Sequence, residues 1–401
     1  MSRPELALFR FGIMATVVLL LAALAMSKVE AAPAAGEVDL KITSPSAILV
    51  EAGSGTVLWE KDADQRRPIA SVTKIMTLAL VMEALESGRI SLDDVVTASE
   101  HAASMGGSQI WLEVGEQMAV SELLRAVAIE SANDASVALA EHVAGTEEAF
   151  VDMMNAKARE IGANNTSFIN ATGLPGSTPE EDCFSTARDV AIMSRELLKY
   201  PKIHEWLTIW IGYVRDGKNM LTNTNRLIRF YEGADGLKTG YTDRSKYCLS
   251  ATALRNGVRM VSVVLSAPTS DVRFSDARKL LDYGFRVCEA KVVARAGQEI
   301  AKVRVAKGVA ETVPLTVDRD LSVVVRRGEE AKIEARLTVP NVVMAPVSQG
   351  QAVGKMSAFR DGVEVGAVDV VSAQDVKRAS LVPLVVRSTR GIFRSIFLFR
   401  S

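Results

Sequence analysis

Histidine is scarce in this sequence. The 401 residues include only three, His101, His142 and His204, and none occurs in a metal-ligand spacing such as His-Glu-x-x-His. We therefore predict no metal and no cofactor, and a metal-dependent hydrolase is not expected. A Ser-His-Asp triad would have to use one of these three residues. A hydrolase of this composition would more readily take its general base from another residue type.

Cysteine and excess charge are also scarce. Cys183, Cys248 and Cys288 make an odd number without Cys-x-x-Cys spacing, so they predict neither a disulfide framework nor a metal site. One disulfide and three reduced cysteines are both compatible with this count. The formal net charge is −1, and the body of the chain has no basic stripe of the kind that nucleic-acid-binding proteins carry. We expect no nucleic-acid partner.

The N-terminal residues have the composition of an export signal. Arg3 and Arg10 precede a largely apolar stretch of 16 residues (11–26), which is followed by a stretch of small residues. This pattern is typical of a cleaved signal peptide, here predicted over residues 1–34. A permanent anchor is the alternative, but a helix that spans a bilayer needs about 20 apolar residues. Either interpretation predicts that the rest of the chain is exported.

The C-terminal segment 381–401 is both basic and apolar. At helical spacing, Ile392 and Ile396 fall on one side and Arg390 and Arg394 on the other. An apolar face opposite an arginine face favours an amphipathic helix that lies at a membrane surface. A helix docked on the protein itself is the alternative.

Between these ends, the pattern of the sequence changes near residue 289. Residues 37–288 mix helical patterns, among them a buried helix over 71–87, with β-rich runs that include a hairpin at Asn256-Gly257. Residues 289–378 contain only short β-branched runs separated by charged turns. We predict an α/β (α+β) domain over 37–288 and a small all-β sandwich over 289–378.

The segment IASVTKIMTL places Ser71 three residues before Lys74. On a helix these two side chains would share one face. A lysine whose pKa is lowered by burial and nearby cations could then remove the serine proton and activate the hydroxyl as a nucleophile. This is the only Ser-x-x-Lys pair in the chain. The alternative is that Ser71 is a simple helix N-cap.

Two later motifs add polar groups suited to the same chemistry. SANDA supplies Ser131 and Asn133, which could relay a proton and hold a substrate amide, although a helix cap is the alternative. DGLKTGYT supplies Lys238 and Thr239, which could bind a carboxylate, and Gly240, where a ligand could approach the backbone closely. A simple turn is the alternative for this second motif.

In this order, Ser-x-x-Lys, Ser-x-Asn and Lys-Thr-Gly resemble the motif set of penicillin-binding proteins and serine β-lactamases. The stretches GGSQIWLEVGE, VSELLRAVAIESANDASVALAEHVAG and GADGLKTGYT are similar to the S11 family of D-alanyl-D-alanine carboxypeptidases. The resemblance covers about residues 40–288, and the β-rich part and the tail also look like that family's C-terminal domain and membrane anchor. It implies a serine β-lactamase/DD-peptidase-like fold for the first domain.

The resemblance also implies substrates and roles. Peptidoglycan pentapeptide stems would be the substrates and β-lactam antibiotics the covalent inhibitors, on the extracytoplasmic (periplasmic) face of the bacterial cytoplasmic membrane. The backbone N–H groups of Ser71 and Tyr241 would form an oxyanion hole. The implied catalytic residues are Ser71 as nucleophile, Lys74 as base and Ser131 as proton relay, and the implied substrate-binding residues are Asn133, Lys238, Thr239, Gly240 and Tyr241.

Three other interpretations compete with this one: a β-lactamase, a DD-endopeptidase and a non-catalytic penicillin-binding module. A class A β-lactamase would need a deacylating glutamate in a Glu-x-x-Leu-Asn loop before Lys238, and the candidate loop has Glu180 and Glu181 without that motif. Thr172 and Cys183 stand where histidine occurs in some relatives. The resemblance therefore leaves the rate of deacylation open.

Overall fold

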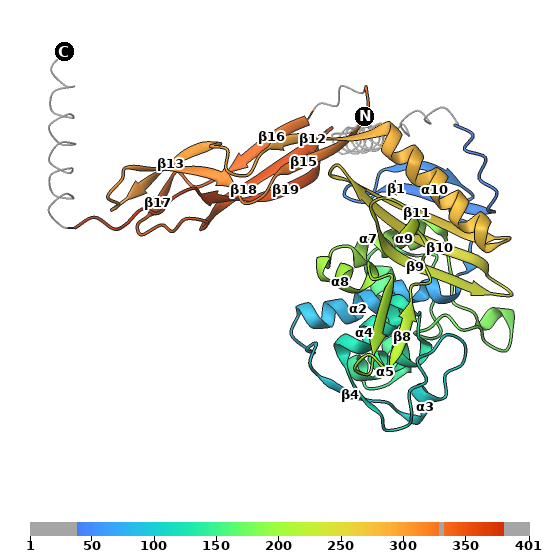
Figure 1. The fold of residues 1–401 in the computed structure, drawn as a ribbon. Coiled ribbons are helices and arrows are strands. Elements are labelled where there is room, and N and C mark those ends of the chain that lie inside the picture. The colour runs from blue at the N-terminus through green and yellow to red at the C-terminus, as the bar shows by residue number, and fades with distance from the viewer. Residues whose placement is uncertain (1–37, 329–332, 381–401) are drawn as a thin grey trace, which may run out of the picture. The chain divides into compact units, whose positions relative to one another are not determined.

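The computed structural model describes residues 38–328 and 333–380 (Figure 1). The predicted signal peptide and the predicted C-terminal amphipathic helix lie outside the described residues. Among the residues that are described, no helix combines the length and the apolar character needed to cross a membrane. Cys183, Cys248 and Cys288 are all buried and none of them forms a disulfide, so the alternative of one disulfide is wrong.

The first part of the chain is built on a five-stranded antiparallel sheet with the order β2-β1-β11-β10-β9 (Figure 1). Asn256 and Gly257 join β10 to β11 with φ of +49° and +77°, and this confirms the predicted hairpin. Strand β9 ends the sheet, so only one of its edges pairs with another strand of the sheet. The strands are β1 (Ser46–Glu51), β2 (Val57–Lys61), β9 (Ala234–Thr242), β10 (Lys246–Arg255) and β11 (Val258–Ala267).

Helices cover both faces of this sheet. Gly284 of α10 (Ser270–Val287) packs against Met260, whereas Ser194 of α7 (Ala187–Leu197) shares a hydrogen bond with Ser250. Ser250 pairs with Val263, three residues from Met260 along β11. Because successive side chains of a strand point to opposite faces, α7 and α10 lie on opposite sides of the sheet.

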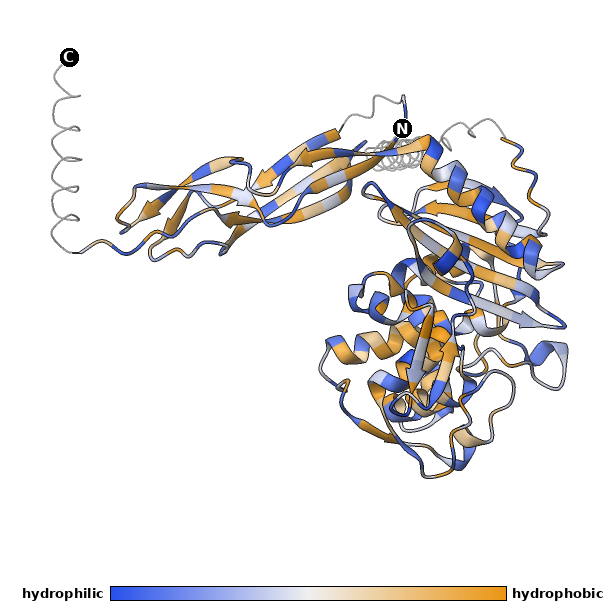
Figure 2. Ribbon diagram, in the orientation of Figure 1, coloured by the Kyte–Doolittle hydropathy of each residue, from blue (hydrophilic) through white to orange (hydrophobic). Residues whose placement is uncertain are grey.

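A helical layer on the α7 side surrounds α2 (Lys74–Glu86). Ten of the first eleven residues of α2 are buried, and Glu83 is the exception. The predicted buried helix is thus confirmed, although its first turn is a 3₁₀ helix, η1 (Ala70–Thr73). Figure 2 shows that hydrophobic residues gather in this layer and along the strands. The other helical elements are α3 (Glu100–Ala103), α4 (Val120–Ile129), α5 (Asn133–Ala144), α6 (Glu147–Glu160), η2 (Pro179–Glu181), η3 (Pro201–Ile203), α8 (His204–Leu207) and α9 (Leu227–Phe230).

There are also three short antiparallel strand pairs in the described residues. Some join segments that are distant in sequence, and others are local hairpins. They are β3 (Arg67–Pro68) with β6 (Phe184–Ser185), β4 (Val95–Thr97) with β5 (Gln117–Ala119), and β7 (Ile211–Val214) with β8 (Asn219–Thr222). The β3–β6 pair holds the chain that leads into η1 against the segment that contains Cys183, whose carbonyl accepts the Ile69 N–H.

The second part is all β in its described residues, as predicted. A two-stranded sheet of β12 (Cys288–Ala294) and β15 (Leu321–Arg326) accompanies a six-stranded sheet of order β16-β18-β19-β14-β13-β17. Alternate residues of β15 are buried, as expected for a strand with one face on a core. The six strands are β13 (Ala301–Ala306), β14 (Thr312–Val317), β16 (Ile333–Thr338), β17 (Val342–Met344), β18 (Ala352–Arg360) and β19 (Val363–Ser372).

Candidate active site

Ser71 and Lys74 come together at the start of α2, as the sequence predicts. Ser71 lies in η1, Lys74 is the first residue of α2, and Lys74 Nζ is 3.0 Å from Ser71 Oγ. Neither η1 nor α2 has a side-chain hydrogen bond at its N-terminus. The alternative that Ser71 is a helix cap is therefore wrong, and its hydroxyl is directed to the lysine instead.

The other contacts of Lys74 orient its amine. Lys74 is fully buried, and Nζ lies 2.6 Å from Asn133 Oδ1 and 2.7 Å from the Thr172 carbonyl oxygen. Both of these oxygens can only accept hydrogen bonds. A neutral amine has two N–H donors and one lone pair, so the two acceptors occupy both donors. The lone pair is left for the third neighbour, the hydroxyl of Ser71.

The surroundings of Lys74 favour the neutral amine. Burial, followed by the nearby cation Lys238, lowers the pKa of Lys74 well below its usual value. Cys183 and Asp134 act in the opposite direction with smaller effects. A lysine that is uncharged at working pH can accept a proton from a serine.

Asn133 is held in the orientation that this arrangement needs. Its Nδ2 donates to the Gly106 carbonyl at 2.7 Å, which fixes the amide so that Oδ1 faces Lys74. The next residue, Asp134, is buried and accepts the N–H groups of Ile110 and Leu112, both at 3.0 Å to Oδ2. The break between α4 and α5 is thereby fastened to the segment that precedes α4.

Ser131 lies in this break with an unusual backbone. Its φ is +70°, a conformation that non-glycine residues rarely adopt, and it is only 4% exposed. Its Oγ has no hydrogen-bond partner among the described residues. Strained backbone and unsatisfied buried hydroxyls concentrate at functional sites. The alternative of a cap for α5 is wrong, because α5 has no side-chain cap.

The Lys-Thr-Gly motif lies in β9, not in a simple turn. Lys238 is 1% exposed, and burial, followed by the charge of Arg273, lowers its pKa to about 7. Arg273 donates to the Gly240 carbonyl at 3.2 Å, so it also fastens the strand. Thr239 donates through Oγ1 to Thr224 Oγ1 at 2.7 Å. Two cationic side chains and a threonine hydroxyl thus gather at one strand.

The backbone after Thr239 lies directly against η1. A Cβ added to Gly240 would be 2.8 Å from the Ile69 carbonyl and 3.1 Å from Ser71 N, so only glycine allows this approach. Tyr241 is half exposed, and its hydroxyl donates to Asp243 at 2.9 Å. The side chain of Tyr241 is thus engaged by Asp243. The main chain of Tyr241 directly follows Gly240, which lies against Ser71.

Sequence reasoning missed the main-chain role of Thr172 and the glycine that follows it. In the sequence, only the side chain of Thr172 is noticeable, because it stands where some relatives have histidine. In the structure it is the Thr172 carbonyl that contacts Lys74. Gly173 has φ +79°, and a Cβ there would overlap the carbonyl of Ala70. The glycine of the NATGLP stretch was the one signal that could have indicated a close backbone approach. Cys183 lies nearby, with Sγ 3.7 Å from the Asn170 carbonyl.

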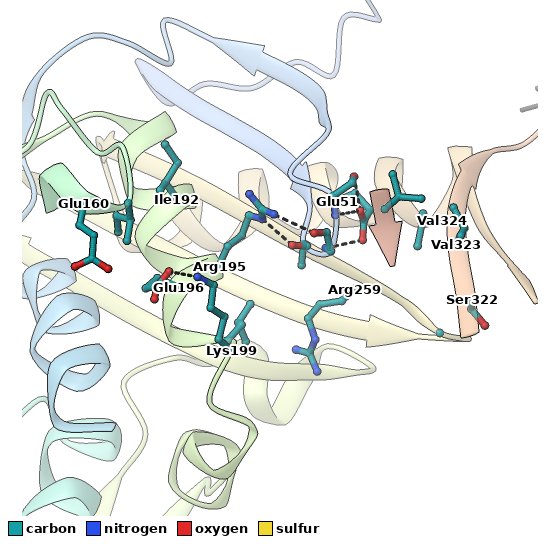
Figure 3. A pocket seen from close by; sticks show the side chains of 17 residues that line it. Glu51, Glu160, Ile192, Arg195, Glu196, Lys199, Arg259, Ser322, Val323 and Val324 are labelled. Carbon is teal, nitrogen blue, oxygen red and sulfur yellow. Dashed lines mark hydrogen bonds and ion pairs between the residues drawn. The ribbon is translucent and has the colours of Figure 1, made fainter. Parts of the chain in front are cut away.

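A separate pocket, shown in Figure 3, includes none of the predicted site residues. Its charged groups are engaged by the protein: Glu51 accepts the N–H groups of Gly53 and Ser54, and Arg195 donates to the Ala52 carbonyl at 2.7 Å. Glu196 pairs with Lys199 at 2.6 Å. The groups with catalytic chemistry are instead those around Ser71.

Comparisons with known proteins agree with this geometry. Residues 28–269 match the peptidase S11 family, described as D-alanyl-D-alanine carboxypeptidase, and residues 289–378 match the penicillin-binding protein 5 C-terminal domain. The chain is 43% identical to D-alanyl-D-alanine carboxypeptidase DacF of Bacillus subtilis over 354 residues, which are 87% of this chain and 90% of that protein. It is 34% identical to DacC of Escherichia coli over 366 residues, 86% of this chain and 88% of that protein.

Solved structures are also similar to this chain. Penicillin-binding protein 5 of Haemophilus influenzae has a TM-score of 0.62 and 32% identity, covering 84% of this chain and 98% of that one. Penicillin-binding protein D2 of Listeria monocytogenes, solved in an ampicillin-bound form, has a TM-score of 0.55 and 32% identity, covering 60% and 97%. With its Ser-Lys pair, its mixed α/β first part and its β-rich second part, this chain belongs to the peptidase S11 family of D-alanyl-D-alanine carboxypeptidases, serine hydrolases of the penicillin-binding-protein type.

Proposed function

We propose that Ser71 is the nucleophile of a D-alanyl-D-alanine carboxypeptidase that trims peptidoglycan pentapeptide stems. The observation that carries this proposal is the triple contact of Lys74 Nζ with Asn133 Oδ1, the Thr172 carbonyl and Ser71 Oγ. In the neutral amine, which burial favours, this arrangement leaves the lone pair for the serine proton. No comparable pair of nucleophile and base was found elsewhere in the sequence.

The proposed reaction has two halves. Lys74 takes the Ser71 proton while Oγ bonds to the carbonyl carbon between the two D-alanines, and the N–H groups of Ser71 and Tyr241 hold the oxyanion. The proton passes through Ser131 to the leaving nitrogen, the C–N bond breaks and D-alanine departs. Water then adds to the ester carbon and returns a proton to Ser71 Oγ. The stem is released one residue shorter.

Substrate binding would use the Lys-Thr-Gly strand and Asn133. Lys238 and Thr239 would bind the terminal carboxylate, Asn133 would hold the substrate backbone, and Gly240 would let the substrate approach the main chain. β-Lactams would acylate Ser71 in the same way, and the ampicillin-bound form of the Listeria relative supports this. The contacts of Glu181, one of the two glutamates in the candidate loop, do not favour a β-lactamase. Its carboxylate is engaged within that loop, where it accepts the Ser177 N–H at 2.7 Å.

The direct experiment is to incubate the protein with diacetyl-Lys-D-Ala-D-Ala and to measure free D-alanine. Release should occur, should stop after treatment with penicillin, and should not occur with the same peptide ending in L-alanine. Absence of release by folded protein that still reacts with penicillin would overturn the carboxypeptidase proposal. Hydrolysis of nitrocefin over many turnovers would support a β-lactamase instead.

The low pKa of Lys238 gives this binding site a pH dependence. Its pKa is about 7 in the free protein, so the ammonium that binds the carboxylate is lost as the pH rises above that value. We expect KM for diacetyl-Lys-D-Ala-D-Ala to be about tenfold higher at pH 8 than at pH 6, since about a tenth of Lys238 is then charged. Steady-state kinetics across this range would measure it. The peptide with a C-terminal amide is the control, and an equal rise for both peptides would contradict this role of Lys238.

Family membership points to an extracytoplasmic location. We further propose that residues 1–34 are an export signal, that the domains extend over 37–288 and 289–378, and that residues 381–401 attach the protein to the periplasmic face of the cytoplasmic membrane. Deleting residues 383–401 should move the protein from the membrane fraction to the soluble fraction, with D-alanine release unchanged. Fractionation and immunoblotting would measure this. A truncated protein that stays with the membrane would contradict the anchor.

A further inference from the structure

The Thr172 carbonyl that contacts Lys74 belongs to a tight turn over residues 170–174. Asn170 Oδ1 accepts the N–H groups of Thr172 at 3.2 Å and Gly173 at 2.7 Å, and its Nδ2 donates to the Leu174 carbonyl at 2.9 Å. These bonds join the turn to itself, as asparagine side chains often do. They give the turn its shape but do not set where it lies relative to Lys74.

Two side chains from neighbouring helices hold the turn in place through Ala171. Glu147 Oε1 accepts the Ala171 N–H at 2.8 Å, and Thr77 Oγ1 donates to the Ala171 carbonyl at 2.7 Å. Ala171 is fully buried, so water cannot easily replace either partner. The residue immediately before Thr172 is thus fixed at both of its main-chain polar groups.

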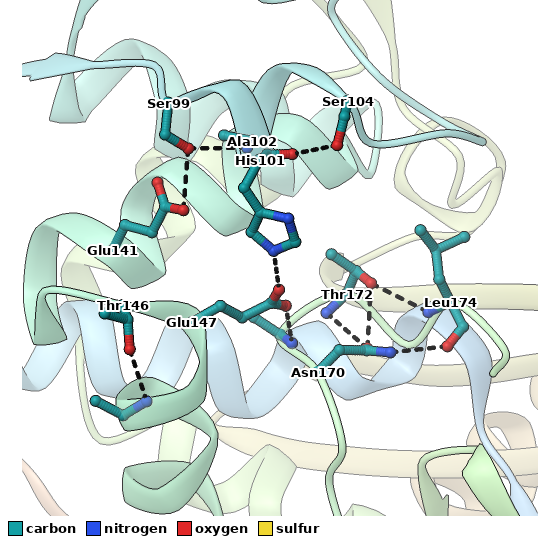
Figure 4. A network of polar contacts seen from close by, with 12 residues as sticks. Ser99, His101, Ala102, Ser104, Glu141, Thr146, Glu147, Asn170, Thr172 and Leu174 are labelled. Carbon is teal, nitrogen blue, oxygen red and sulfur yellow. Dashed lines mark hydrogen bonds and ion pairs between the residues drawn. The ribbon is translucent and has the colours of Figure 1, made fainter.

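Glu147 is itself held by a second contact. Its Oε2 lies 2.7 Å from His101 Nε2, and Figure 4 shows the carboxylate between the His101 ring and the turn. Glu147 is the first residue of α6 and is 9% exposed, so its charge is nearly removed from solvent. A buried carboxylate with one donor on each oxygen keeps a single orientation.

We propose that Glu147 is a positioning residue for the general base, because it holds the Ala171 N–H and thereby places the Thr172 carbonyl where that oxygen occupies a donor of Lys74. Without this contact the turn can withdraw, Lys74 can rotate, and its lone pair no longer faces Ser71. This inference rests on the proposed role of Lys74 as base. It adds to that role a residue that touches neither the substrate nor the reacting atoms.

The test compares two replacements of Glu147 in the full chain, with penicillin acylation measured against pH. Glu147→Ala removes the acceptor and should slow acylation about 10²-fold, the effect of a small misplacement of a reacting group, with little change in the dissociation constant of the non-covalent complex. Glu147→Gln keeps an amide oxygen for the Ala171 N–H and should stay within a few-fold of the native rate. Glu148→Ala, which removes an exposed carboxylate next in sequence, is the matched control.

The pH profile separates positioning from a loss of folded protein. Burial is the main cause of the lowered pKa of Lys74, so water entering a loosened site should move the acidic limb of the Glu147→Ala profile to higher pH. If this variant fails to fold, Glu147→Asp, with a carboxylate one carbon shorter, should show the same displacement with a smaller loss of rate.

Two results would overturn the inference. One is a Glu147→Ala protein that acylates at the native rate per folded molecule with an unmoved acidic limb. The other is a Glu147→Gln protein as slow as Glu147→Ala. Acylation that persists in Ser71→Ala would instead overturn the proposed function, so the two failures can be told apart.

Discussion

The Ser71→Ala variant is expected to lose both D-alanine release and covalent labelling by penicillin. Removal of a serine nucleophile in another hydrolase lowers the turnover number by about 10⁶-fold, and a comparable loss is expected here. Lys74, Asn133 and the Thr172 carbonyl remain after the substitution, but no oxygen is left to form the ester. Release of D-alanine and the mass of the protein after penicillin treatment would measure the two losses.

A matched serine controls for effects on the helix. Ser87 follows α2 at its opposite end, where its Oγ donates to the Ala84 carbonyl. Ser87→Ala should release D-alanine at close to the native rate. If Ser71→Ala still gained the mass of penicillin on another residue and still released D-alanine, Ser71 would not be the nucleophile.

The second large effect is expected for Lys74. Replacing this residue by methionine removes the base but nearly keeps its length, and acylation should slow by about 10²- to 10⁴-fold, the usual contribution of a general base. The rate of penicillin acylation under single-turnover conditions would measure this loss. Methionine cannot accept the Ser71 proton, because its thioether sulfur is only a weak acceptor.

Stability should change much less than activity in this variant. The pKa of Lys74 is lowered in the folded protein, so at neutral pH the unfolded chain binds more protons and burial of the amine opposes folding. Relief of this burial favours Lys74→Met, whereas the loss of a donor for Asn133 Oδ1 and the Thr172 carbonyl opposes it, so we expect a melting temperature close to the native one. A Lys74→Met variant that acylates at the native rate would contradict the role of Lys74 as base. A variant that loses activity only because it unfolds would contradict the expected melting temperature.

Much of this site could be predicted from sequence because its chemistry is carried by side chains. Ser71, Lys74 and Asn133 were expected to act together, and their atoms do lie within hydrogen-bonding distance. Their spacing along the chain also made Ser71 compatible with a helix cap. The structure separates the two interpretations at the helix start, where no side chain caps η1 or α2 and Lys74 Nζ lies 3.0 Å from Ser71 Oγ. The contact of Lys74 with the Thr172 carbonyl could not be predicted, because Thr172 is distant in sequence and every residue possesses a carbonyl.

The fold could be predicted where local signals are strong. Asn256-Gly257 specifies a hairpin by itself, and the apolar run after Lys74 specifies a buried helix. The 3₁₀ turn of η1 and the β3–β6 pair were not predicted, because both depend on contacts between distant segments. The contacts of Glu147 were missed for the same reason, since its partners His101 and Ala171 come from other elements.

The turn that carries Ser71 is enclosed by main chain on two sides, with Gly173 against Ala70 and Gly240 against Ile69. A side chain at either glycine would overlap this main chain, so the turn that carries Ser71 or the segment against it would have to shift. Substitutions at these two positions are therefore not expected to slow the reaction with an antibiotic while sparing the natural substrate. If β-lactams acylate Ser71 as proposed, substitutions that slow this acylation are expected where side chains, and not backbone, face the antibiotic.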